Sequence, residues 1–267
     1  SQVSGGIEYS DYLLAGNDAR FVSEFALGAI DHGAAVSNRV ELEAAEKSTA
    51  SWRLGLRDTL SGERFETEVA LLVNTGGTEV PRIGEMTGTR TKNRLLYSKG
   101  VHLVVPQVTD SGRTLAFFDD TKRLFYVLPM AHRSVIGTTD TRVTDPNVAV
   151  TEEDRAFLLE QANSRLELSR PIIDTDVIAE RCGVRSLVVP PGGASEDREW
   201  TELSRRHAVE VDERNNVISV LGGKLSDCLN VGEAVIEGAR RCGLRPMTPA
   251  RPWYGDPDSA ERAKFDD

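Results

Sequence analysis

The chain has 267 residues, of which 39% are hydrophobic and 28% charged, a composition that suits an ordinary soluble globular protein with one large core or two modest ones. Its net charge of −10 argues against a general nucleic-acid binder, which would need a basic face. Scattered cysteines and histidines without CxxC or metal-ligand spacing predict neither a disulfide framework nor a metal site, and no apolar run is long enough to span a membrane. We therefore expect a cytoplasmic protein in a reducing compartment.

The first part of the chain predicts a helix followed by a hairpin. Asn17 or Asp18 can cap a helix whose apolar positions share one face, and Gly33 follows where a left-handed residue is expected. Apolar residues alternate with arginines over 52–57 and predict a half-buried strand, with 64–68 as its return strand. This helix looks as if it belongs within a domain, so we expect the chain to be a fragment that lacks the domain's opening segment.

An uninterrupted apolar run follows at residues 69–73 and is typical of a central strand covered on both faces. It ends in Asn74-Thr75-Gly76-Gly77, whose glycines allow the backbone to pass close to a ligand.

The middle of the chain is rich in strand patterns. Residues 100–141 predict antiparallel strands joined by short polar turns. Thr151 with Asp154 predicts the N-terminal cap of a helix that extends past Leu166, and Pro171 ends it.

Gly222-Gly223-Lys224 follows an apolar strand and is predicted to open a helix that runs to about Arg241. A helix N-terminus favours a negatively charged ligand. A P-loop is excluded because Ile218 and Leu225 occupy two of its required positions. Two interpretations stay open on this pattern alone: a backbone that approaches a ligand, or a tight packing turn with a solvated lysine.

Three further side chains are candidates for chemistry, each with a structural alternative. His102 begins an apolar strand and could act as a general base or be a satisfied structural residue. Arg185 and Arg205 could hold a phosphate or carboxylate in a fork of hydrogen bonds, or be solvated surface residues.

Helices alternate with apolar strands at both ends of the chain, around the β-rich middle. We therefore predict an α/β plus α+β body. Residues 1–85 and 214–246 would form one discontinuous domain, residues 86–213 an inserted cap, and residues 247–267 a linker.

Taken in order, several segments make the chain similar to the FAD-dependent glycerol-3-phosphate dehydrogenase family. They are 17–20 (NDAR), 99–106 (KGVHLVVP), 136–141 (IGTTDT), 150–154 (VTEED), 183–185 (GVR), Ser204-Arg205 and 222–225 (GGKL). The resemblance covers the chain to about Gly243.

The resemblance implies a partial FAD-binding domain of D-amino-acid-oxidase-like fold with a mixed-sheet substrate cap, followed by an absent helical domain. It implies oxidation of sn-glycerol 3-phosphate to dihydroxyacetone phosphate, with quinone as electron acceptor and a peripheral place on the inner face of the membrane. The implied residues are His102 and Lys224 as catalytic, Arg185, Arg205 and Lys99 as substrate-binding, and Asn74, Gly76, Gly77, Gly222, Gly223, Leu225 and Ser226 as cofactor-binding.

The sequence departs from the family at several points. No G-x-G-x-x-G fingerprint, the usual pyrophosphate-binding loop, occurs in it. Leu96 replaces a frequent arginine, Ser186 a usual proline, and 74–77 is a looser version of the family's stretch. Two alternatives stay open: another FAD-dependent oxidase of this fold acting on an amine or amino acid, and a non-catalytic truncated module. Oxygen could also replace quinone.

Overall fold

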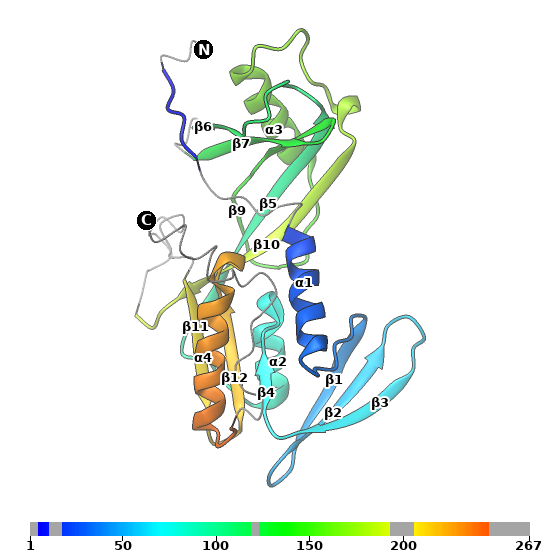
Figure 1. The fold of residues 1–267 in the computed structure, drawn as a ribbon, viewed down its shortest axis with the longest axis vertical. Helices are drawn as coiled ribbons and strands as arrows, with labels where there is room; N and C mark the ends of the chain where they lie inside the picture. Colours follow the sequence, from blue (N-terminus) through cyan, green and yellow to red (C-terminus); the bar gives the residue numbers. More distant parts are fainter. Residues whose placement is uncertain (1–4, 11–17, 119–122, 193–205, 246–267) are drawn as a thin grey trace, which may run out of the picture.

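The computed structural model describes residues 5–10, 18–118, 123–192 and 206–245. These form two parts joined by two long strands, with α1 beside the junction (Figure 1). The α/β plus α+β architecture predicted from the sequence is confirmed, since several separate sheets combine with helices. Arg205 and the predicted linker at 247–267 lie outside the described residues.

The helices are α1 (Asp18–Asp31), α2 (Val80–Thr87), α3 (Glu152–Arg165) and α4 (Cys228–Arg241), with 3-10 turns η1 (Gly77–Glu79), η2 (Asp174–Asp176) and η4 (Leu225–Asp227). The strands are β1 (Val40–Lys47), β2 (Trp52–Asp58), β3 (Arg64–Val69), β4 (Leu72–Asn74), β5 (Arg94–Pro106), β6 (Leu115–Phe118), β7 (Leu124–Met130), β8 (Arg133–Gly137), β9 (Thr141–Val143), β10 (Ala179–Val189), β11 (His207–Asp212) and β12 (Val217–Gly222).

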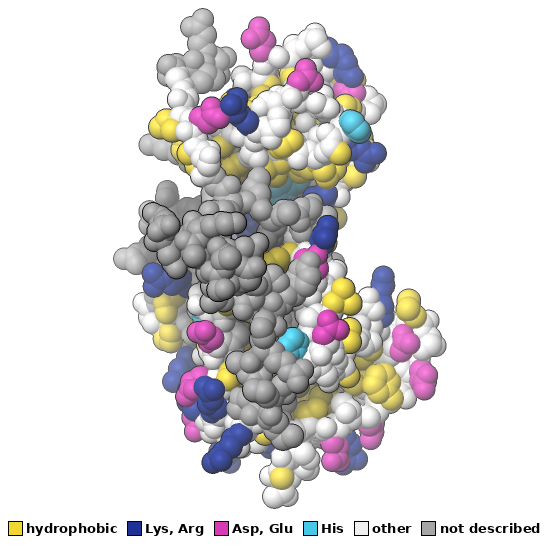
Figure 2. All heavy atoms as spheres, viewed as in Figure 1, with side chains coloured by type: hydrophobic (Ala, Val, Ile, Leu, Met, Phe, Trp, Pro, Cys, Tyr) yellow, Lys and Arg dark blue, Asp and Glu magenta, His cyan; other side chains and the backbone are white. Residues whose placement is uncertain are grey.

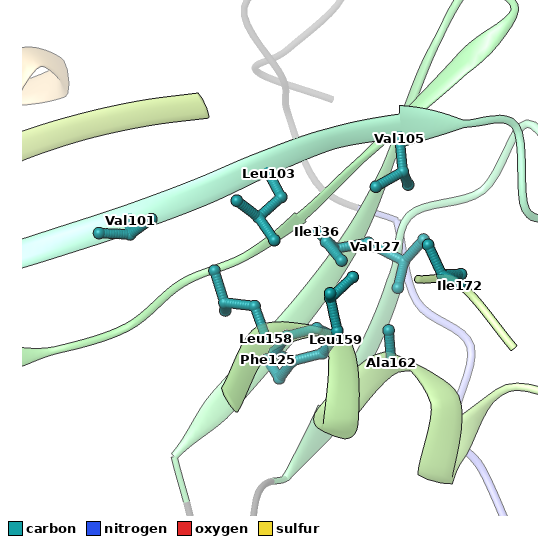
Figure 3. Close-up of a cluster of buried hydrophobic side chains, with 10 residues drawn as sticks. All are labelled: Val101, Leu103, Val105, Phe125, Val127, Ile136, Leu158, Leu159, Ala162 and Ile172. Atoms are coloured by element: carbon teal, nitrogen blue, oxygen red, sulfur yellow. The ribbon is translucent and has the colours of Figure 1, made fainter. Parts of the chain in front are cut away.

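The cap is built on a six-stranded sheet of order β10-β5-β8-β7-β6, with β9 also pairing with β5. Helix α3 covers one face of this sheet. Its Leu158 and Ala162, one turn apart, are fully buried in a cluster that also contains Leu103 of β5 and Val127 of β7 (Figure 3). The capping box between Thr151 and Asp154 is present, which confirms the helix start predicted from the sequence.

The other part contains a three-stranded sheet of order β11-β12-β4, in which β12 is antiparallel to β11 and parallel to β4. Residues 217–221 of β12 are all buried, so β12 has the character of a central strand. Helix α4 packs closely on this sheet: a Cβ at Gly238 would lie 2.9 Å from side-chain carbons of both Ile218 and Val211. Glycine therefore permits this helix–strand distance.

The central strand predicted at residues 69–73 is wrong. Val69 ends β3, and Leu72 begins the three-residue strand β4, which lies at the edge of its sheet among the described strands. The run is apolar because it crosses between two sheets: Val69 and Leu72 both pack on a cluster formed by Trp52, Leu54 and Val217.

That cluster also joins the antiparallel sheet β1-β2-β3 to the β11–β12 turn. The indole nitrogen of Trp52 donates to the Asn215 carbonyl oxygen at 2.8 Å, and the Lys47 ammonium lies 5.1 Å from the Trp52 ring centroid. The alternating pattern at 52–57 thus predicted its strand correctly.

Two predicted boundaries differ from those in the structure, one of a strand and one of a helix. Strand β11 pairs with β12 along its whole length, so residues 207–212 join the β11-β12-β4 sheet and not the cap, where a boundary at 213 had placed them. The helix predicted to open at Gly222 begins at Cys228, after the turn η4.

On the face seen in Figure 2, acidic and basic side chains of the described residues are interspersed over both parts. The net negative charge is therefore not gathered into one patch on this face. Within the described ranges, no helix is long and apolar enough to cross a membrane.

Candidate active site

Strand β5 presents different chemistry on its two faces. Side chains alternate along a strand, and Val101, Leu103 and Val105 point toward α3, as Figure 3 shows. His102 therefore lies on the opposite face of the sheet, away from the cap's core.

His102 is enclosed by its neighbour on β8. Gly137 pairs directly with His102, and a Cβ at Gly137 would lie 2.5 Å from the imidazole Cδ2, so only glycine leaves room for the ring. Burial lowers the pKa of His102 below its ordinary value, and the positive charges of Arg185 and Arg181 lower it further, while Asp18 at the start of α1 acts in the opposite direction. The imidazole is therefore neutral at neutral pH and can accept a proton.

Arg185 approaches His102 over Gly100 of β5, which has no side chain to block it. It pairs with Ser98, but its guanidinium lies over Gly100, where an added Cβ would come within 2.5 Å of both terminal nitrogens. One terminal nitrogen donates to the Thr138 hydroxyl at 3.1 Å, and the other lies 3.8 Å from an Asp140 carboxylate oxygen. Thr138 follows Gly137, so this arrangement holds the guanidinium beside His102.

Lys99 lies on the other face of β5. Its ammonium is 2.5 Å from Asp154 Oδ2, and the two side chains are only 8% and 7% exposed. Burial acts to raise the pKa of Asp154, but hydrogen bonds from Lys99 and Thr151 outweigh it and hold the pKa below its ordinary value. The lysine therefore ties β5 to the N-terminus of α3. The substrate-binding role predicted for Lys99 stays a prediction.

The Gly222-Gly223-Lys224 turn packs directly on β10. Gly222 has φ +62°, and a Cβ there would lie 2.5 Å from Val188 Cγ2 and 3.3 Å from the Ser186 carbonyl oxygen. Gly223 has φ +99°. Both glycines are needed for this conformation, and they place Lys224, which is exposed, near the strand that carries Arg185.

The same turn is anchored to β11 by a histidine–aspartate pair. His207 Nδ1 lies 2.5 Å from Asp227 Oδ2, the Asn230 amide donates to Asp227 Oδ1 at 2.6 Å, and the Asp227 N–H donates to the Lys224 carbonyl oxygen at 2.9 Å. Leu225 and Ser226 of η4 are both exposed beside this anchor.

The glycine turn after β4 lies at the same sheet edge. Because β4 and β12 are parallel and adjacent, the turns that follow them leave the sheet side by side. Asn74 is buried and shapes its turn, donating to the Val80 carbonyl oxygen at 3.0 Å and accepting from the Gly76 N–H at 3.2 Å. Gly77 has φ +59° and is exposed.

This turn also contacts the antiparallel pair of long strands β5 and β10, called the β5–β10 ribbon below. The Tyr97 hydroxyl of β5 donates to the Thr78 carbonyl oxygen at 3.2 Å. Accessible glycine backbone at the carboxyl ends of parallel strands is where open α/β sheets bind dinucleotides, so these two turns fit a flavin cofactor.

The chain matches the family model described as FAD dependent oxidoreductase over residues 1–225. The chain belongs to the FAD dependent oxidoreductase family. FAD, the cofactor predicted from the sequence, is thereby confirmed.

Relatives of the chain include the glycerol-3-phosphate dehydrogenase of Pseudomonas aeruginosa, which is 28% identical over 243 residues. The match covers 88% of the chain and 46% of the relative. The mitochondrial glycerol-3-phosphate dehydrogenase of Homo sapiens is also 28% identical, over 88% of the chain and 33% of the relative. The chain thus spans less than half the length of these curated relatives.

Two solved structures share the fold of this chain. The glycerol-3-phosphate dehydrogenase of Bacillus halodurans, complexed with FAD, has a TM-score of 0.74 and 24% identity, covering 93% of the chain and 49% of that structure. Glycine oxidase of Geobacillus kaustophilus has a TM-score of 0.54 and 16% identity, covering 84% of the chain and 54% of that structure. The D-amino-acid-oxidase-like FAD-binding fold is confirmed.

Several residues around His102 and Arg185 were not identified from the sequence. Gly100, Gly137 and Thr138 position His102 and Arg185, and Arg181 stands opposite His102. Strand alternation could have separated Lys99 from His102, but the pairing partners require the register of β5 with β8 and β10. Within the described ranges, no group of three His, Cys, Asp or Glu side chains is placed to hold a metal ion.

Proposed function

We propose that the protein to which this chain belongs oxidises sn-glycerol 3-phosphate to dihydroxyacetone phosphate with FAD. One observation carries the proposal: His102 and the Arg185 guanidinium share one face of the β5–β10 ribbon, and the glycine turn at Gly222 packs on the same ribbon. The names of the relatives from Pseudomonas aeruginosa and Homo sapiens support this substrate.

Each side chain has a defined part in the reaction. Arg185, with Arg205 from outside the described residues, binds the phosphate dianion through charge-assisted hydrogen bonds. His102, neutral because its pKa is lowered, accepts the proton of the C2 hydroxyl. FAD, when bound, accepts the hydride from C2. Lys224 adds positive charge beside the substrate and the flavin.

The cofactor contacts that we propose come from the two glycine turns. Gly76, Gly77, Gly222 and Gly223 offer backbone without side chains, while Asn74 shapes the first turn. Leu225 and Ser226 extend the second contact as the exposed start of η4. We propose that the electrons leave to a membrane quinone, with the protein on the cytoplasmic side and peripheral on the inner face.

A second candidate is the oxidation of an amine or amino acid. Its support is the fold shared with the glycine oxidase of Geobacillus kaustophilus. A guanidinium beside the proton acceptor could bind the carboxylate of an amino acid as well as a phosphate. We rank the phosphorylated alcohol first because the relatives from Pseudomonas aeruginosa and Homo sapiens are glycerol-3-phosphate dehydrogenases.

Steady-state kinetics of an Arg185→Ala variant test the proposal. Losing one charge-assisted hydrogen bond costs about 1.5–3 kcal/mol, so KM for glycerol 3-phosphate should rise roughly 10- to 150-fold. Arg53→Ala is the matched control, because Arg53 is an exposed arginine of β2 that pairs only loosely with Glu46, at 3.8 Å. An unchanged KM in Arg185→Ala, or activity with glycine and not with glycerol 3-phosphate, would contradict the proposal.

A further inference from the structure

The strand register places a second arginine beside His102. Arg181 of β10 is paired directly with His102 of β5, and Gly183 is paired with Gly100. Because side chains alternate along a strand, Arg181 and Arg185 point to the same face as His102, and Gly183 between them leaves that face without a side chain. The two arginines therefore stand at either end of a short stretch of bare glycine backbone.

The charge of Arg181 is not neutralised within the described part of the chain. Its one hydrogen bond runs from a terminal nitrogen to Met130 Sδ at 3.4 Å, and a thioether sulfur is a weak acceptor. No carboxylate of the described residues forms an ion pair with it, whereas Arg155 and Arg170, near the same sheet, each pair with aspartate. Although the chain has 42 acidic residues, the charge of this exposed arginine is therefore available to a ligand.

We propose that Arg181 determines substrate specificity at this site: with Arg185 it selects a small dianion, such as a phosphoester, against a substrate that carries an ammonium group at the reacting carbon. This inference rests on the function proposed above and assigns the selectivity to a particular residue.

Electrostatics supplies the reason. Two guanidinium groups flanking the proton acceptor attract a dianion and repel an ammonium group, and the attraction extends over about 8 Å at physiological salt. The protein as a whole is acidic and repels a dianion, so positive charge near the site also speeds its encounter. The downward effect of Arg181 on the pKa of His102 shows that its charge reaches the imidazole.

Ligand binding followed through the imidazole signal of His102 tests the role of Arg181. The signal is assigned by its loss in a His102→Gln variant, and glycerol 3-phosphate or glycine is titrated into the protein and into Arg181→Gln. An exposed charge contact contributes less than a buried one, so the dissociation constant for glycerol 3-phosphate should rise about 1.5- to 5-fold in Arg181→Gln. Glycine carries an ammonium that the guanidinium repels and a carboxylate that it attracts, so its dissociation constant should change little. The preference for the phosphoester should therefore fall by the same factor.

Two variants make the result specific. Arg181→Lys should retain most of the preference because it keeps the charge, and Arg53→Gln should bind as the wild type does. Equal binding in Arg181→Gln and wild type, with binding lost in Arg185→Gln, would overturn the role of Arg181 and leave the proposed function standing. A wild-type His102 signal that does not respond to glycerol 3-phosphate would overturn both.

Discussion

The buried ion pair of Lys99 and Asp154 predicts a large loss of stability when one charge is removed. Asp154→Asn preserves the shape of the side chain but leaves Lys99, whose side chain is 8% exposed, without a counter-charge. Breaking a buried pair in this way costs about 3–5 kcal/mol. For a body of this size each kcal/mol lowers Tm by roughly 2–4 °C, so we expect a decrease of about 6–20 °C.

Thermal unfolding followed by far-ultraviolet circular dichroism measures this decrease. Glu24→Gln is the matched control, because it breaks the exposed Arg20–Glu24 pair, worth about 0.3–0.5 kcal/mol. The double variant Lys99→Met/Asp154→Leu should recover much of the loss, since it leaves no buried charge. An Asp154→Asn variant with the same Tm as the wild type would refute the buried pair.

Acid should act through the same pair. The pKa of Asp154 in the folded protein is below its ordinary value of 3.8. Its contribution to stability is therefore complete above that value and is lost as the pH falls through the folded-state pKa. Asp154→Asn should lack this part of the acid dependence.

The remaining predictions concern the site. Gly137→Ala should displace the imidazole of His102, because the new Cβ would lie 2.5 Å from Cδ2, and should lower kcat with little change in KM. Gly222→Ala forces an alanine to φ +62° and against Val188, which costs about 1–2 kcal/mol from the backbone alone, and should weaken FAD binding measured by flavin fluorescence. The nuclear magnetic resonance titration of His102 should have its midpoint below the ordinary value of 6.5, since burial and then Arg185 lower its pKa, and Arg185→Gln should move it upward. Stability linked to His102 is then complete above 6.5 and decreases as the pH falls below it; a wild-type midpoint at or above 6.5 would contradict the environment described for the imidazole.

Local patterns were sufficient where one element decides the structure. The capping box of Thr151 and Asp154 is a contact between residues three apart, so the sequence predicts it without knowledge of the fold. The strand at 52–57 is likewise visible in its alternation, because one face packs on a core and the other meets solvent.

Local sequence patterns gave the wrong structure where one short segment belongs to two secondary-structure elements. The apolar run 69–73 looks like one central strand, but Val69 and Leu72 belong to different sheets over one core. The glycine pair at 222–223 predicts a turn, but not the 3-10 turn that delays α4 to Cys228.

The candidate site shows the same division. The sequence points to His102, Arg185 and Lys224 as residue types, and strand alternation alone would have placed Lys99 on the opposite face from His102. The contribution of Arg181 depends on the register of β10 with β5, over strands separated by about eighty residues, which no local pattern encodes.

Reduction of the protein-bound flavin without oxygen tests the central claim most directly. Glycerol 3-phosphate should bleach the flavin absorbance in a single turnover, and glycine should not. His102→Gln should still bind FAD but bleach at least about a hundredfold more slowly, the usual contribution of a positioned base. Bleaching by glycine but not by glycerol 3-phosphate, or an unchanged rate in His102→Gln, would contradict a glycerol 3-phosphate site built on His102 and Arg185.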